Sequence, residues 1–336
     1  MKTTYNNTVT DYAQQVQALL CIDAFENLCA KASGRFRIVP LKGIDLIRFL
    51  YSETLDRELR DLDVLVLPEQ RAMGFIELLF SEGYRAEYTF SLDSSALREK
   101  RKVSMLSPSE KIPDIDVHFA LIHKKFFSKT INGFNLDAVS RIRDVDEVVS
   151  VLDNIDRWMY LASHLTFHYL EGEKWYRDLA LLLNRFNEND LDLLISRSKS
   201  YNFERIVGAV CWRMQSKYPD IAGRITLSDL LPSGSDNRFL RYIAFMAEHP
   251  KRLGNGFHLV RYYWEFIFIK RKEHLHHSFV RLLFPSIGNM QNMYRCHAIP
   301  AALLYVPNFI VNALGFLLFM AQYYLISTIR SRSLYA

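Results

Sequence analysis

Two aspartates at the start of a short apolar run limit the possible folds more than any other feature of this sequence. Residues 62–67 are apolar except for Asp63, and Asp61 directly precedes them. The pattern predicts a strand. Successive side chains on a strand point to opposite faces, so Asp61 and Asp63 share one face. Two carboxylates so placed repel each other unless a cation lies between them, and Mg²⁺ is the usual one because it binds oxygen ligands.

The neighbouring patterns predict a mixed α/β or α+β domain. Apolar residues at helical spacing predict helices over residues 9–31 and 68–80, with stops at Gly34 and Gly83. A turn at residues 42–43 leads into a short helix over residues 44–51. The predicted strands cover residues 36–41, 62–67, 86–92, 102–106 and 114–121.

The pattern becomes almost entirely helical after Asp144. We therefore predict a small mixed-sheet domain over residues 1–144, a mostly α-helical domain over 145–295, and an apolar C-terminal helical segment over 296–336. Within that segment residues 298–329 are mostly apolar, and an aromatic, basic stretch over 257–272 precedes it. Three interpretations stay open: a bilayer span, a helical hairpin lying on a membrane, and soluble or partner packing.

Composition and charge narrow the class of protein. The net charge of +5 permits an acidic partner but gives no strong nucleic-acid signal. The four cysteines form no metal-binding pair, and the N-terminus does not resemble a signal peptide. We expect a cytoplasmic protein with free thiols; its association with the inner face of the membrane depends on the C-terminal segment.

Residues around the aspartates extend the candidate site toward a nucleotide. Lys42-Gly43 closes one predicted strand and opens a helix, where backbone N–H groups favour a phosphate. Arg57 precedes the acidic pair and can reach phosphate oxygens. Asp116, on a later predicted strand, is a candidate third carboxylate. Each part alone is weak evidence, since a solvated strand edge with Arg57 and Arg60 as ion-pair partners of the aspartates explains it more often, so the prediction depends on the order of the parts along the chain.

That order resembles an uncharacterised bacterial nucleotidyltransferase-like family with the pattern LKG, R, DiDlLV and GY. The matching residues are Leu41-Lys42-Gly43, Arg57, the run from Asp61 to Val66, and Gly83-Tyr84. The later Ile115-Asp116-Val117-His118 looks like the family's iDlH strand. His164 with the segment from Lys174 to Ala180 is similar to its helical H, W and D pattern. The phosphate turn lacks the Gly-Ser pair that the wider superfamily favours.

This resemblance implies the polymerase-beta-like nucleotidyltransferase superfamily, with a small mixed sheet, two Mg²⁺ ions or Mn²⁺ in their place, and a nucleoside triphosphate (NTP) as donor. It implies that Asp61, Asp63 and Asp116 hold the metals and are catalytic. The residues predicted to bind the nucleotide or its phosphates are Lys42, Gly43, Arg57, His118 and Asp178. His164 and Lys174 are further candidates in the helical part. The acceptor, a small molecule, glycan or protein, stays open.

Two other functions compete with nucleotidyl transfer. One is a non-catalytic binding or scaffold subunit of a membrane-linked biosynthetic assembly. The other is phosphoryl transfer at the same metal site. Convergence of the aspartates beside Lys42 would favour an enzyme.

Overall fold

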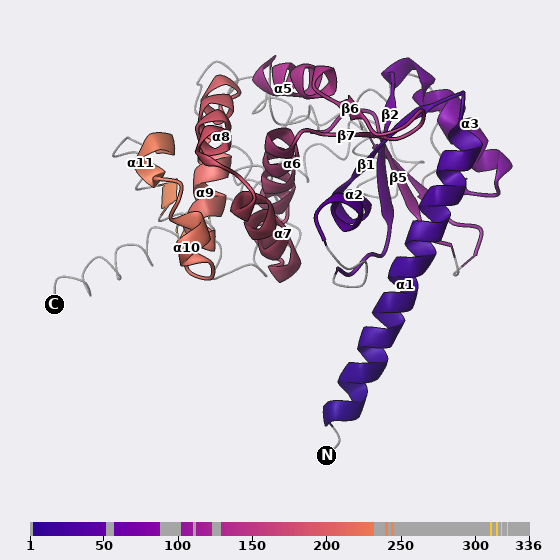
Figure 1. Ribbon diagram of the computed structural model, residues 1–336, viewed down its shortest axis with the longest axis horizontal. Coiled ribbons are helices and arrows are strands. Elements are labelled where there is room, and N and C mark those ends of the chain that lie inside the picture. The colour runs from indigo at the N-terminus through magenta and orange to yellow at the C-terminus, as the bar shows by residue number, and fades with distance from the viewer. Residues whose placement is uncertain are drawn as a thin grey trace. The chain divides into compact units, whose positions relative to one another are not determined.

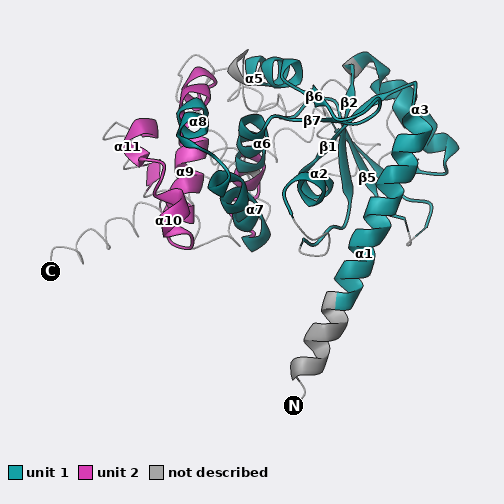
Figure 2. Cartoon of the chain, in the orientation of Figure 1, with its two compact units in different colours: residues 1–124, 129–162, 173–194 teal, residues 125–128, 163–172, 195–336 magenta. Residues whose placement is uncertain are grey.

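The mixed α/β fold expected from the sequence is confirmed by the computed structural model (Figure 1). The structure describes residues 3–51, 57–87, 102–109, 112–122 and 129–231, and the isolated positions 239–240, 243–244, 310, 314, 317 and 321. The described residues belong to two compact units (Figure 2). Unit 1 comprises residues 1–124, 129–162 and 173–194, and unit 2 comprises 125–128, 163–172 and 195–336. The predicted domain boundaries at 144/145 and 295/296 stay predictions.

A five-stranded sheet forms the centre of unit 1. Its strands in spatial order are β1 (Arg37–Leu41), β2 (Leu62–Leu67), β5 (Ile115–His118), β4 (Lys102–Leu106) and β3 (Arg85–Ala86). β2 and β5 run parallel, whereas the other neighbouring pairs are antiparallel. The predicted bounds of β2 and β4 match those of the structure. β3 was predicted over residues 86–92; it begins at Arg85 and ends at Ala86, Glu87 is a bend, and residues 88–92 lie outside the described part.

One face of this sheet is buried under two helices, α1 (Thr3–Ala32) and α3 (Ala72–Ser81) (Figure 1). Leu62, Val64 and Val117 of the central strands pack there with Phe25 of α1 and Phe75 of α3. Because side chains alternate along a strand, Asp63 and Asp116 lie on the opposite face. The hydrophobic core thus fixes which face of the sheet is polar.

The turns around the sheet follow the sequence with one difference. α1 ends at Ala32 and α3 at Ser81, and Gly34 and Gly83 follow with φ of +68° and +87°, conformations that favour glycine. α3 is preceded by a short 3₁₀ helix over Glu69–Arg71. The predicted turn at residues 42–43 is instead the first turn of α2 (Lys42–Phe49), which starts directly after β1.

The later part of the chain is mostly helical, as predicted. The helices are α5 (Lys129–Ser140), α6 (Asn154–Phe167), α7 (Glu173–Asn184), α8 (Glu188–Ser200), α9 (Glu204–Met214), α10 (Pro219–Ala222) and α11 (Leu227–Leu230). Two features were not predicted: helix α5, and a small antiparallel pair of β6 (Arg143–Asp144) with β7 (Ser150–Val151). Strands of two residues are too short to show an alternating pattern.

The predicted apolar segment over residues 298–329 lies outside the described residues except at 310, 314, 317 and 321. Within the described part of the chain, no helix combines the length and the apolar character that crossing a membrane requires. The three interpretations of this segment stay predictions.

A buried ion pair fixes α2 beside the sheet. Asp45 of α2 is 1% exposed and Arg157 of α6 is 5% exposed. Arg157 donates through Nε to Asp45 Oδ2 at 2.6 Å and through Nη2 to Oδ1 at 3.0 Å. Removing one partner of a buried pair leaves the other charge uncompensated, which costs more than the pair itself contributes. This pair therefore holds the helix that begins with Lys42.

We expect Asp45→Ala to lower the free energy of unfolding by about 3–5 kcal/mol, because Arg157 would stay buried without its counter-ion. Chemical denaturation followed by circular dichroism measures the change. Glu26→Ala is the matched control: it removes an acidic residue, 65% exposed, that lies 3.9 Å from Arg48, and should cost less than about 1 kcal/mol. Equal losses in the two variants would contradict this role.

Candidate active site

Asp63 and Asp116 lie directly opposite each other on neighbouring parallel strands. The register of β2 with β5 pairs Leu62 with Ile115 and Asp63 with Asp116. Both carboxylates are on the face turned away from α1 and α3, and Asp63 is 4% exposed. The structure therefore brings together two of the three aspartates that the sequence singled out.

His118 is the third member of this cluster. It follows Asp116 by two residues on β5, so it shares that face, and it is 3% exposed. Its Nε2 lies 2.9 Å from Oδ1 of Asp63. The potential ligand atoms of Asp63, Asp116 and His118 all lie within 4.8 Å of one another, and among the described residues no other trio of acidic, histidine or cysteine side chains is so arranged. We call these three residues the metal-ligand cluster.

Lys42 approaches the cluster from the start of α2. Its Nζ lies 2.5 Å from Oδ1 of Asp63, and its backbone φ of +50° is unusual for a residue other than glycine. Gly43 follows, and a Cβ there would lie 2.4 Å from Cδ1 of the buried Leu59. The sharp strand-to-helix connection, which needs a small second residue, thus aims the ammonium group at Asp63.

Lys102 and Ser104 of β4 complete the surroundings of Asp116, and the sequence analysis missed both. Ser104 lies opposite Asp116 in the antiparallel register, and its hydroxyl donates to Oδ1 at 2.6 Å. Lys102 forms an ion pair with Oδ2 of Asp116. Their alternation on a correctly predicted strand was a usable signal, because residues 102 and 104 must share one face.

The charges around the cluster determine its protonation. Burial alone would raise the pKa of Asp63, but the Lys42 ammonium and the hydrogen bond from His118 outweigh it and hold that pKa well below its ordinary range. Burial lowers the pKa of His118, against the opposing effect of Asp63. At neutral pH the cluster therefore offers an ionised carboxylate beside a neutral imidazole.

Asp61, the other aspartate of the predicted trio, lies just before β2 and is not part of the metal-ligand cluster. Its side chain is exposed. Desolvation by the protein atoms around its carboxyl group, and then the negative charge of Asp63, raise its pKa. Asp61 is thus an electrostatic neighbour of the cluster at the rim of the site.

Arg57 and Asp178, two of the predicted nucleotide-binding residues, bind each other. Arg57 Nε donates to both oxygens of Asp178 at 2.9 and 3.0 Å, and Nη2 donates to Oδ2 at 2.8 Å. The Tyr51 hydroxyl also donates to Asp178 Oδ1 at 2.7 Å. Arg57 is 6% exposed and Asp178 is 0% exposed. In this structure the pair joins the segment before β2 to helix α7.

The weaker helical candidates, Lys174 and His164, are not part of the metal-ligand cluster. Lys174 Nζ is 3.4 Å from Glu58 Oε2, and the ring of His164 on α6 is 4.5 Å from the ring of His168, which follows α6. The carboxylates of the cluster act on Tyr160 of α6. Burial, and then the negative charges of Asp63 and Asp116, raise the pKa of its hydroxyl well above the ordinary value. Tyr160 is buried and was not predicted, because nothing in its local sequence distinguishes it from a core residue.

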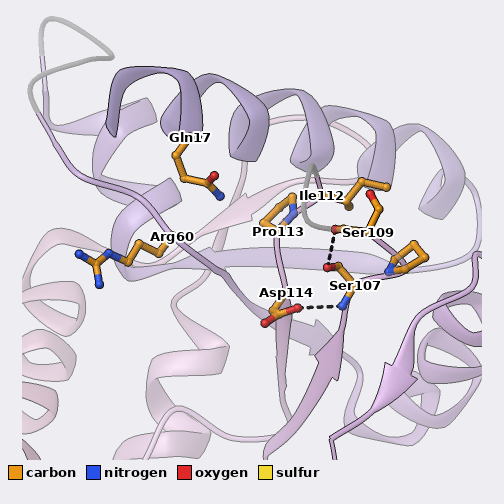
Figure 3. Close-up of a pocket in the computed structure, with 8 residues that line it drawn as sticks. Gln17, Arg60, Ser107, Ser109, Ile112, Pro113 and Asp114 are labelled. Atoms are coloured by element: carbon orange, nitrogen blue, oxygen red, sulfur yellow. Dashed lines mark hydrogen bonds between the residues drawn. The ribbon is translucent and has the colours of Figure 1, made fainter. Parts of the chain in front are cut away.

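A separate polar cavity of 510 Å³ lies near the starts of β2 and β5 (Figure 3). Gln17 of α1, Arg60, Ser107 and Asp114 are among the residues that line it. Asp114 lies two residues before Asp116, a spacing that places both on one face of a strand. Its carboxylate accepts a hydrogen bond from the Ser107 amide at 2.7 Å. None of the three cluster residues lines this cavity, so Asp114 serves the loop after β4.

The cluster fits a divalent metal ion by the chemistry of its donors. Two carboxylates on adjacent strands and a buried imidazole offer oxygen and nitrogen ligands at short mutual distances. Lys42 and Lys102 each neutralise one of the carboxylates. A divalent ion neutralises the same two carboxylates, so it can take the place of the lysine ammonium groups at this site.

Comparison with known proteins agrees with the resemblance found in the sequence. The model of a family described as an uncharacterised nucleotidyltransferase matches residues 10–219, well over half of the chain. The match includes the whole sheet, the metal-ligand cluster and the Arg57–Asp178 pair, and it confirms the predicted family. A search of curated proteins finds no match.

We expect Arg57→Met and Asp178→Asn each to destabilise the chain, and the double variant to lose less than the sum of the two. Removing one member of a buried ion pair leaves its partner unpaired and costs about 3–5 kcal/mol. The stability changes caused by substituting two residues in direct contact are not additive. A double-mutant cycle in chemical denaturation measures the coupling. If neither single substitution changed the free energy of unfolding, the result would instead support phosphate binding as the main role of Arg57.

Proposed function

We propose that this chain, which belongs to the uncharacterised nucleotidyltransferase family, transfers a nucleoside monophosphate from an NTP to a hydroxyl group of an acceptor. The observation that carries the proposal is the metal-ligand cluster beside Lys42. Opposed carboxylates next to a strand-to-helix connection combine a cation site with a phosphate site.

Asp63 and Asp116 would hold a divalent cation at the opposed positions of β2 and β5. When bound, that cation neutralises charge on the phosphates and polarises the reacting phosphoryl group. Asp61, at the rim of the site, adds negative charge that would favour a second cation in the presence of a nucleotide. This assignment keeps all three predicted aspartates in the proposal and gives them unequal roles.

Lys42 and Lys102 would bind the phosphate oxygens. Both ammonium groups face the cluster, from opposite sides of the β2–β5 pair. Gly43 stands in the first turn of α2, where a backbone N–H has no partner within the helix and the helix dipole favours an anion. The phosphates therefore have two mobile cations and one fixed donor available to them.

In the transfer step an acceptor hydroxyl oxygen forms a bond to the α-phosphorus, and the bond from that phosphorus to the bridging oxygen breaks. Pyrophosphate leaves with the electron pair of the broken bond. We propose that Asp116, positioned by the hydrogen bond from Ser104 to its Oδ1, accepts the proton of the acceptor hydroxyl once Lys102 has moved to the phosphates. The acceptor class stays open.

The decisive experiment compares the two ends of the nucleotide. The full chain is incubated with each NTP, Mg²⁺ or Mn²⁺ and a cell lysate, with the label on the α- or the γ-phosphate. We expect label from the α-position on the acceptor and label from the γ-position in pyrophosphate. Label from the γ-position on the acceptor would establish phosphoryl transfer instead. Nucleotide binding without any transfer would favour a non-catalytic subunit.

We expect Asp63→Asn to lower the rate of label transfer about a hundredfold or more, since it removes a carboxylate that would hold the cation neutralising the reacting phosphates. Asp114→Asn is the matched control. It makes the same change at the residue directly before β5, which is outside the cluster. The rate of this variant should stay near that of the wild type. Equal rates for Asp63→Asn and the wild type would refute the assignment.

We expect Lys102→Met to raise the KM for NTP about tenfold or more, the effect of losing one charged hydrogen bond to phosphate. The same substitution should strengthen binding of the divalent cation alone, because Asp116 loses the ammonium that competes for it. Steady-state kinetics and calorimetric titration measure the two effects. Weaker cation binding together with an unchanged KM would show that Lys102 only supports the fold.

A further inference from the structure

We propose that His118 is a metal ligand alongside Asp63 and Asp116, and that this set of two carboxylates and one imidazole selects Mn²⁺ over Mg²⁺. The inference rests on the proposed function in taking the cluster as the cation site, and deepens it by naming the third ligand and the preferred ion. The resemblance assigned His118 only to the nucleotide and gave the metal ligands as Asp61, Asp63 and Asp116.

The positions of the three side chains carry the first step. Ligands bound at about 2.1 Å from one octahedral ion lie roughly 3.0–4.2 Å apart. The potential ligand atoms of Asp63, Asp116 and His118 all lie within 4.8 Å of one another. Modest side-chain rotations therefore bring all three to one ion. Asp61, which would make a purely carboxylate site, is exposed and outside this group.

The orientation of the imidazole carries the second step. Nε2 of His118 is directed at the cluster, since it lies 2.9 Å from Oδ1 of Asp63. Nδ1 is buried and has no hydrogen-bond partner in the described part of the chain. Without a cation, Nε2–H donates to Asp63; with a cation bound, a proton on Nδ1 instead would leave the lone pair of Nε2 directed toward the ion between the carboxylates. A lone pair so placed can bind a metal and cannot donate to Asp63.

The rigidity of the site carries the third step. His118 and Asp63 are 3% and 4% exposed, and both stand on paired strands of one sheet. Mg²⁺ demands oxygen ligands and retains several of its waters, which a buried imidazole cannot replace well. Mn²⁺ shares the preference of Mg²⁺ for carboxylates but, as a first-row transition metal, also binds sites that mix oxygen and nitrogen ligands. The burial of His118 thus favours the ion that tolerates nitrogen.

The alternative is a structural histidine that donates an Nε2–H to Asp63 and binds no ion. Electron paramagnetic resonance of Mn²⁺ bound to the full chain separates the two, because pulsed measurements detect hyperfine coupling to a directly bound imidazole nitrogen. We expect this coupling in the wild type, and a Kd for Mn²⁺ at least about tenfold lower than that for Mg²⁺ by calorimetry. Bound Mn²⁺ without nitrogen coupling, or equal affinities, would overturn the proposal.

A matched pair of variants completes the test. His118→Gln keeps an amide that can donate to Asp63 but lacks the imidazole, so we expect the nitrogen coupling and the preference for Mn²⁺ to disappear. His168→Gln makes the same change at an exposed histidine of the segment after α6 and should retain both. Retention in His118→Gln would refute ligation by His118. The coupling in the wild type needs no variant, so a poorly folded variant leaves the test intact.

The failure of this inference is distinguishable from failure of the proposed function. Transfer of the α-label with no nitrogen coupling would remove His118 from the metal site and leave nucleotidyl transfer standing. Nitrogen coupling with no transfer of label would confirm the ligand set and remove the enzymatic role. The two measurements use the same chain and different observables.

Discussion

The parallel pairing of β2 with β5 is the constraint on which the rest of the site depends. It places the buried Asp63 beside Asp116, and two ionised carboxylates so close require positive charge nearby. Lys42 supplies it from one side and Lys102 from the other. A one-residue change in register would turn one of the aspartates toward the apolar core. The hydrophobic face under α1 and α3 therefore fixes the register that places both aspartates on the opposite face.

Buried ion pairs extend this order beyond the sheet. The pair of Asp45 with Arg157 fixes α2, and with it the backbone of Lys42. The pair of Arg57 with Asp178 fixes the segment that leads into β2 against α7. Such pairs are weak sources of stability but specify one arrangement, because each alternative leaves a charge unpaired. In this chain they connect residues more than a hundred positions apart to the elements that carry the site.

The sequence predicted what local patterns determine and missed what distant contacts determine. The bounds of β2 and β4 and the glycine stops follow from alternation and turn chemistry. The contact of Arg57 with Asp178 was not predicted, because the two residues lie 121 positions apart. Lys102 was overlooked although its strand was correct, since no motif marks it. Whether Asp61 or His118 completes the ligand set depends on side-chain positions that no spacing rule provides.

The charge balance of the site links its two proposed ligands. Asp61, Asp63 and Asp116 face two ammonium groups, so the site already has near-equal charges of both signs. In the proposed function, a divalent ion alone would displace the lysines and leave excess positive charge, whereas a triphosphate alone would add excess negative charge. With both bound, the cation would take the carboxylates and the freed lysines would take the phosphates. Each ligand would then strengthen the binding of the other by the same factor, as linkage requires, and the lysines of the ligand-free site would provide this coupling.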